Sequence, residues 1–196
     1  MTTAESALPL YRRVLGDDFE RLPGAVKRLH DHSGQLCANG LCRVSRGSGV
    51  VSRVIARLFA LPPSGESLPV RVCFIAEGEA ELWERDFAGH RLKTRQGGLA
   101  GRPGLIYETF GPGRFIVRPR VMPHGLDLEL LGVRLLGLPL PRLFWPRIRG
   151  HEGEDAGRFT FDVAIMLPLV GLLVAYSGFL EPQEETPASR DAREWP

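Results

Sequence analysis

The sequence predicts an α+β fold that is mainly β: a curled antiparallel sheet or barrel of about seven or eight strands, with two or three N-terminal helices packed at its mouth or side. The 196 residues include 23 Gly and 16 Pro without any repeat, and both residues destabilise helix interiors, which disfavours a helical bundle. From Pro69 onward, segments of alternating apolar and polar residues are separated by turn residues at a spacing typical of barrels and sandwiches. Closing such a sheet removes its exposed edges.

The helical signals lie in the first third of the chain. Apolar residues recur at helical spacing near the N-terminus, where Gly16 interrupts the pattern and Pro23 suits a new first turn. These features predict two short helices, over residues 8–15 and 22–31. A third helix is predicted over residues 50–61, where apolar residues follow one face and arginines the other.

The remaining segments are assigned to strands. Residues 35–46 are interpreted as a β-hairpin, because Asn39-Gly40 is a favoured pair for a two-residue turn. Residues 158–180 supply the final strands of the sheet. The intermediate strands are predicted over residues 70–75, 79–87, 91–96, 105–110, 115–121 and 126–136.

An apolar run over residues 163–180 requires a choice between a membrane-spanning helix and two strands. The run is uncharged and close to the length that spans a bilayer, but Pro168 and Gly171 interrupt its middle. Two strands joined by a bend are therefore favoured. We expect one barrel-like domain over residues 1–180, followed by a charged, proline-containing tail, residues 181–196, that is disordered.

Charge and cysteine content narrow the function classes. The 25 basic and 23 acidic residues nearly cancel and alternate along the chain, which disfavours nucleic-acid binding. No secretory signal is visible and the three cysteines are an odd number, so we expect a cytoplasmic protein. In the predicted hairpin Cys37 faces Cys42, close enough for a disulfide, but two reduced thiols are favoured and their spacing does not indicate a metal site.

Trp83, Arg85 and Phe87 alternate along one predicted strand, so their side chains face the same side of the sheet. If that side is the barrel interior, Arg85 needs a carboxylate partner, and Glu108 on a later strand is the candidate. The pair would anchor the polar head of a ligand while Trp83 and Phe87 contact its apolar body. A salt bridge that only braces two strands is the alternative interpretation.

Two further residues are candidates for proton transfer. His30 ends the second predicted helix, where it either interacts with the helix dipole or acts as a general base at the barrel mouth. Tyr176 and Arg158 are interpreted as a proton donor and an anion anchor, with a buried structural ring as the alternative for Tyr176. The sequence contains no dinucleotide-binding, P-loop or zinc-protease motif, so neither a cofactor nor a metal is predicted.

A series of short motifs extends over about residues 8–181. They include Leu22-Pro23, Gly40-x-x-x-Val44-x-Arg46-Gly47, Trp83-x-Arg85-x-Phe87, Glu108-x-x-Gly111-Pro112, Leu167-Pro168-x-x-Gly171 and Tyr176-x-Gly178-x-Leu180. Their order and spacing resemble a bacterial family known as domain of unknown function 4166. Relatives often look like the C-terminal partner of a saccharopine-dehydrogenase-like nucleotide-binding domain, so the resemblance implies an accessory or substrate-handling role. Around Tyr176 this chain departs from its relatives: Ala175, Ser177 and Phe179 stand where they tend to carry arginines and Trp.

Three hypotheses for function follow. The first is a barrel that binds a hydrophobic small molecule, with the ligand-binding candidates Arg46, Trp83, Arg85, Phe87 and Arg158. The second is a cofactor-free cyclase, isomerase or hydrolase, with the catalytic candidates His30, Glu108 and Tyr176. The third is an accessory module that docks on a separate NAD(P)-dependent reductase. Membrane attachment, through residues 163–180 or the helix over 50–61, is the least favoured interpretation.

Overall fold

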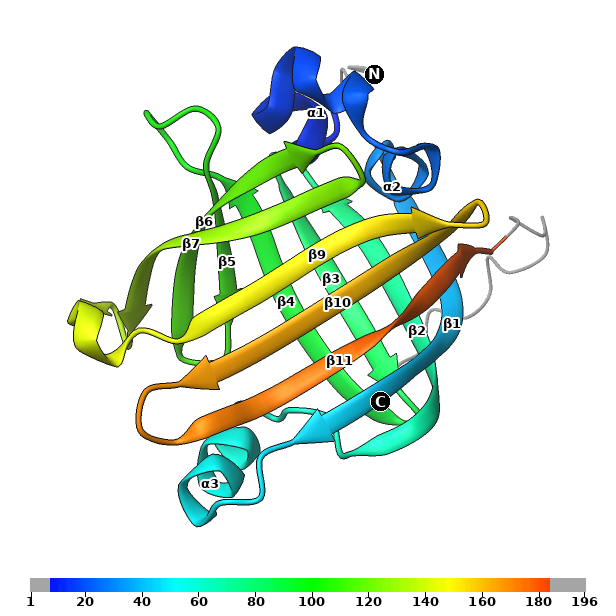
Figure 1. The fold of residues 1–196 in the computed structure, drawn as a ribbon. Coiled ribbons are helices and arrows are strands. Elements are labelled where there is room, and N and C mark those ends of the chain that lie inside the picture. The colour runs from blue at the N-terminus through cyan, green and yellow to red at the C-terminus, as the bar shows by residue number, and fades with distance from the viewer. Residues whose placement is uncertain (1–7, 184–196) are drawn as a thin grey trace, which may run out of the picture.

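Ten antiparallel strands form a closed barrel in the computed structural model, which describes residues 8–183 (Figure 1). The strands are β1 (Gln35–Arg46), β2 (Gly65–Glu77), β3 (Ala80–Phe87), β4 (His90–Gly98), β5 (Ile106–Phe110), β6 (Gly113–Met122), β7 (Gly125–Leu135), β9 (Arg147–Asp155), β10 (Arg158–Leu167) and β11 (Gly171–Pro182), with the short β8 (Leu138–Pro139) beside β7. Neighbours follow the order β6-β5-β4-β3-β2-β1-β11-β10-β9-β7, and pairing of β6 with β7 closes the ring. The predicted class, mainly β with a few helices, is confirmed.

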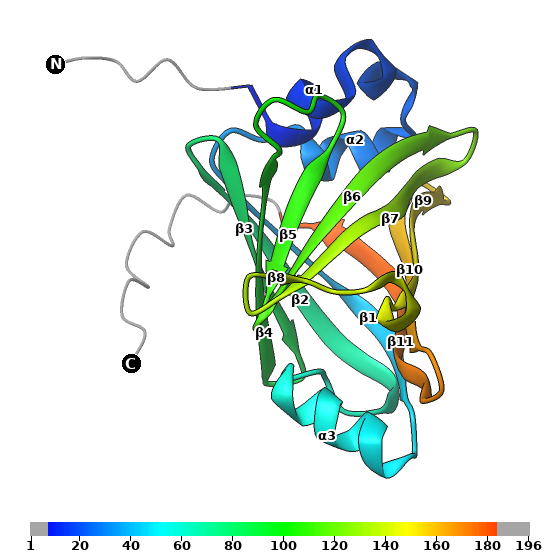
Figure 2. The same ribbon diagram turned by 90° about the vertical axis from the view of Figure 1, so that its left-hand side faces the viewer.

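Helices lie at both ends of the barrel (Figure 2). One end is covered by α1 (Leu10–Leu15), the 3₁₀ helix η1 (Gly16–Arg21) and α2 (Gly24–His30), close to the two helices predicted there. The other end carries α3 (Val50–Leu58), in the segment predicted to be helical. A short 3₁₀ helix, η2 (Arg142–Phe144), follows β8.

A fully buried aromatic layer attaches the N-terminal helices to the barrel. Tyr11 and Phe19 come from the helical segment, and Phe74 comes from β2. The Tyr11 hydroxyl also donates a hydrogen bond of 2.9 Å to Oε1 of Gln96 on β4. The layer closes this end by apolar burial and by a satisfied buried polar contact.

The barrel has ten strands rather than about seven or eight, and residues 35–46 differ from the prediction. They form one continuous strand, β1, so the predicted hairpin is wrong and Cys37 does not face Cys42. Gly40 lies in mid-strand, where a Cβ atom would sit 1.8 Å from the carbonyl oxygen of Phe179 on β11. The glycine therefore allows a close backbone approach, which in sequence looks the same as a turn signal.

The strand β9 has no counterpart in the prediction. Its cavity-facing positions are Ile148, Gly150 and Glu152, and only the first is a large apolar residue. Because strand prediction depends on alternation of apolar and polar residues, this segment carries almost no strand signal.

The apolar run over residues 163–180 forms most of β10 and β11, joined by a turn after Pro168, as predicted. Within residues 8–183, none of the helices combines the length and the hydrophobicity needed to cross a bilayer. β11 continues to Pro182, and residues 184–196 of the predicted tail lie outside the described part of the chain.

Cys37 and Cys73 form a disulfide between β1 and β2, where they are directly opposite in register. The prediction of two reduced thiols at Cys37 and Cys42 is therefore wrong for Cys37. Cys42 is the free cysteine among the described residues, and burial raises the pKa of its thiol to about 11. An odd number of cysteines thus leaves one pair and one buried thiol.

Removing this disulfide is expected to lower the free energy of unfolding. The bond joins residues separated by 36 positions, and loss of such a cross-link costs about 2–4 kcal/mol. Urea denaturation of a Cys37→Ser/Cys73→Ser double variant would measure the loss, and a reductant should destabilise the wild type while leaving the variant unchanged. Three titratable thiols in protein denatured without reductant would contradict the pairing.

Candidate functional site

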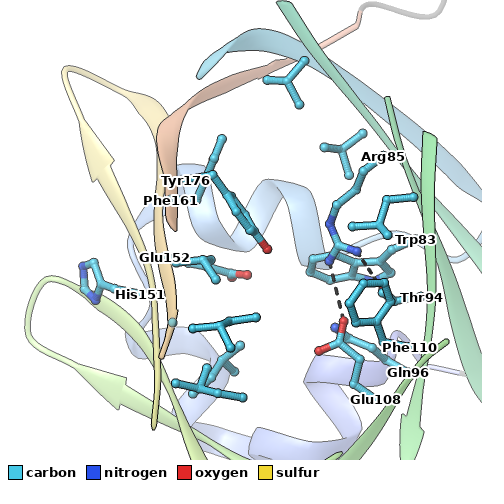
Figure 3. Close-up of a pocket in the computed structure, with 18 of the residues that line it drawn as sticks. Trp83, Arg85, Thr94, Gln96, Glu108, Phe110, His151, Glu152, Phe161 and Tyr176 are labelled. Carbon is cyan, nitrogen blue, oxygen red and sulfur yellow. Dashed lines mark hydrogen bonds and ion pairs between the residues drawn. The ribbon is translucent and has the colours of Figure 1, made fainter. Parts of the chain in front are cut away.

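The barrel encloses a cavity of about 140 Å³ between the N-terminal helices and the α3 end. Its wall is mostly aliphatic and aromatic, with valines of β2 and β6 and phenylalanines of β10 among the lining residues. Six polar side chains interrupt this wall and point inward (Figure 3): Arg85, Thr94, Gln96, Glu108, Glu152 and Tyr176. An apolar chamber with a few converging polar groups is the usual form of a small-molecule site.

The β3 strand places Trp83, Arg85 and Phe87 in the cavity wall, as their alternation predicted. Glu81 shares this face, and its Oε2 accepts a hydrogen bond of 3.0 Å from the Trp83 indole nitrogen. The indole plane is therefore fixed, and Arg85 lies over it with the guanidinium carbon 4.8 Å from the ring centroid. This is a cation–π arrangement in a mostly apolar chamber.

The predicted approach of Arg85 and Glu108 is present. Nη2 of Arg85 lies 3.8 Å from Oε1 of Glu108, and Nη1 donates a hydrogen bond of 2.8 Å to Oγ1 of Thr94. The strands β3, β4 and β5 are consecutive neighbours and carry Arg85, Thr94 and Glu108, respectively. The arginine charge is thus neutralised inside the barrel, while part of each side chain still faces the cavity.

His30 lies fully buried at the end of α2 and reaches the cavity only through another residue. Its Nε2 is 2.6 Å from Oε2 of Glu152, and Glu152 in turn lines the cavity. The imidazole packs on Tyr11 with ring centroids 3.9 Å apart. His30 Nδ1 is buried without a hydrogen-bond partner among residues 8–183.

Glu152 is the main site residue that the sequence does not reveal. It lies on β9, which carries no alternating pattern, and it reaches His30 only because the barrel closes and α2 covers its end. A buried histidine needs a polar partner, so burial of His30 at the end of α2 was the one feature that could have indicated a missing carboxylate.

Tyr176 projects from β11 into the cavity, opposite Arg85 and close to Glu152 (Figure 3). Its ring packs edge-on against Phe87, with centroids 5.7 Å apart. Burial raises the pKa of the hydroxyl; the charge of Arg85 opposes this shift, and the charges of Glu108 and Glu152 add to it. The hydroxyl is therefore a neutral hydrogen-bond donor at physiological pH.

Two of the predicted ligand-binding residues do not line the cavity. The Arg158 guanidinium carbon lies 4.4 Å over the ring of Phe179, away from Tyr176, so the predicted pair of Tyr176 and Arg158 does not form. Arg46 is the last residue of β1 and is also absent from the cavity wall. The other six predicted residues lie in the wall or, for His30, directly behind it.

Comparison with known protein families gives a match. A family described as a domain of unknown function (DUF4166) matches residues 22–180. The matched residues include all strands from β1 to β10 and all but the last two residues of β11. No curated protein matches the sequence. Within the described residues, no three His, Cys, Asp or Glu side chains gather closely enough to hold a metal ion.

Proposed function

The chain belongs to the domain of unknown function 4166 family, and we propose that its barrel binds a small, mainly apolar molecule carrying one polar group. The observation that carries this proposal is the apolar cavity inside the barrel, into which Arg85, Glu108, Glu152 and Tyr176 point (Figure 3). A structural core would be filled with side chains, since interiors pack with few voids larger than a water molecule.

The volume of the cavity limits the size of the ligand. About 140 Å³ is close to the engineered apolar cavity of about 150 Å³ that accommodates benzene. The barrel as it stands therefore suits a single ring or a short branched chain, and a lipid-sized molecule would require the walls to move apart.

The polar groups favour a neutral ligand. Arg85 already lies against Glu108, and Glu152 lies against His30, so a third charge in the cavity would have no counter-charge. The Tyr176 hydroxyl supplies a donor and the Glu152 carboxylate an acceptor. A hydroxyl or carbonyl group on the ligand would satisfy both without adding charge.

Four probes of similar size test this selectivity: benzene, phenol, benzoate and benzylamine. Phenol is expected to raise the melting temperature most, benzene less, and the two charged probes not at all. Native mass spectrometry of the freshly purified protein would detect a retained ligand. An empty protein that none of the four probes stabilises would overturn the proposal.

Two variants connect the expected binding to the cavity. Tyr176→Phe removes only the inward hydroxyl and should abolish the advantage of phenol over benzene. Tyr107→Phe is the matched control, because Tyr107 lies under Arg114 and does not line the cavity. Equal losses in both variants would show that the cavity hydroxyl has no role in binding.

A second candidate function is proton transfer on a bound carbonyl compound, an isomerase activity without a cofactor. The Glu152 carboxylate is held by buried His30 and lies close to Tyr176 on the same side of the cavity (Figure 3). Glu152 would take a proton from the carbon beside the carbonyl while Tyr176 donates its proton to the oxygen, giving an enol that can be reprotonated. Cyclohexanone in D₂O should then exchange its α-protons faster with the protein than with a Tyr176→Phe variant.

Docking on a separate NAD(P)-dependent reductase is supported by the family resemblance alone and stays a prediction.

A further inference from the structure

The helix α3 is oriented with its apolar face toward solvent. Small residues face the barrel: Ser52 and Ala56 are buried, and the Ser52 hydroxyl donates to the Leu172 carbonyl oxygen at 3.1 Å. Four large apolar side chains on the other side are between 55% and 67% exposed: Val50, Val51, Val54 and Leu58. A surface helix normally buries this face, so α3 leaves its main apolar stripe without a partner among the described residues.

Two arginines lie beside this stripe. At 100° per residue, Arg53 and Arg57 lie next to the Val50 and Val54 positions, on the opposite side of the stripe from Ile55. Both are exposed, and neither has an ion-pair partner within residues 8–183. Apolar side chains bordered by cations that can extend past them are typical of helices that lie in a membrane interface.

The turn between β10 and β11 continues the exposed apolar surface. This turn adjoins α3, which packs on the first residues of β11 (Figure 1). Leu169 at its tip is fully exposed and has a φ of 63°, a conformation that costs energy for a residue with a side chain. Nothing within the described chain compensates for exposing a leucine there.

Charge is distributed unevenly between the two ends of the barrel. The five connections on the α3 side of the barrel, with the strand residues next to them, contain nine arginines and two carboxylates over residues 46–66, 86–91, 110–114, 134–149 and 166–172. The connections and helices of the opposite end contain seven basic and eight acidic residues over 8–35, 77–80, 98–106, 122–125 and 154–158. Only the α3 end therefore combines exposed apolar side chains with a large excess of positive charge.

We propose that the α3 end docks on the surface of an anionic phospholipid bilayer, with Val50, Val51, Val54, Leu58 and Leu169 inserted among the lipids. The excess of arginines complements an anionic surface, and lipid accepts protruding side chains from separate loops without a matching shape. A second copy of the chain is disfavoured, since two such ends would bring their arginines together. The proposal is independent of any ligand in the cavity.

Flotation of the full chain with vesicles tests the docking. The protein should float with vesicles containing phosphatidylglycerol and much less with vesicles of phosphatidylcholine alone, and added salt should weaken the binding. Val54→Glu/Leu58→Glu should reduce bound protein about tenfold or more, because it removes two inserting side chains and adds repelling charge. Arg53→Gln/Arg57→Gln should reduce binding and flatten its dependence on salt.

Leu8→Glu is the matched control, because Leu8 is 63% exposed but directly precedes α1, which lies at the end of the barrel opposite α3 (Figure 2). All substituted positions are exposed, and circular dichroism would verify that each variant is folded. Failure of the wild type to float with anionic vesicles, or equal binding of the α3 variants, would overturn the proposal. A dimer in light scattering that Val54→Glu/Leu58→Glu dissociates would also overturn it, and would assign this face to a second copy.

Discussion

Replacing His30 with leucine is expected to destabilise the barrel by about 3–5 kcal/mol, measured by urea denaturation at neutral pH. The substitution leaves the Glu152 carboxylate in the interior without the imidazole that now lies 2.6 Å away. A buried charge that loses its partner keeps the full cost of its desolvation. The double variant His30→Leu/Glu152→Leu should recover most of this stability, because an apolar pair needs no counter-charge.

The molecule contains its own control for this result. His151 and Asp127 form a pair of the same length, 2.6 Å, but their side chains are 38% and 46% exposed, against 0% and 9% for His30 and Glu152. His151→Leu should therefore cost no more than about 1 kcal/mol. Similar losses for His30→Leu and His151→Leu would contradict the argument that burial determines the energy of the inner pair.

The parts of the candidate site that lie on a single strand could be predicted from the sequence. The contacts that form only when the barrel closes and α2 covers its end could not. The inward direction of Trp83, Arg85 and Phe87 follows from the period of a strand, a purely local property. Glu108 was predictable as well, because an interior arginine requires a carboxylate. Glu152 was not, since its contact with His30 joins residues 122 positions apart across the closed end.

The alternation of inward- and outward-facing residues along β10 could have excluded one of the predicted pairs. On β10 the cavity-facing residues are Phe159, Phe161, Val163 and Ile165, all at odd positions. Arg158 therefore belongs to the outer face, and its pairing with inward-facing Tyr176 was excluded by alternation alone.

The fold was predictable in its class and in most of its elements, but not around Asn39-Gly40. That dipeptide favours a two-residue turn when only the local sequence is considered. In the barrel, β1 lies between β2 and β11, and its pairing with both neighbours overrides the local preference for a turn. The long-range pairs that decide this strand are the ones that a single sequence does not display.

Gly40→Ala is expected to destabilise the protein by about 4 kcal/mol or more, or to abolish folding. The new Cβ would lie 1.8 Å from the Phe179 carbonyl oxygen and 3.2 Å from the Leu180 Cα, and both of these atoms belong to the β11 backbone. Backbone atoms cannot rotate away as a flexible side chain can, so β1 and β11 would have to separate. Thermal and urea denaturation would measure the loss.

Gly98→Ala provides the comparison, because Gly98 is also a strand residue but a Cβ there meets nothing within 4 Å. It should change the stability by no more than about 0.5 kcal/mol. Gly178→Ala on β11 should resemble Gly40→Ala, since its Cβ would lie 2.1 Å from the Leu41 carbonyl oxygen. A stable Gly40→Ala variant would mean that residues 35–46 do not run as one strand against β11, and a hairpin centred on Asn39-Gly40 would then have to be considered again.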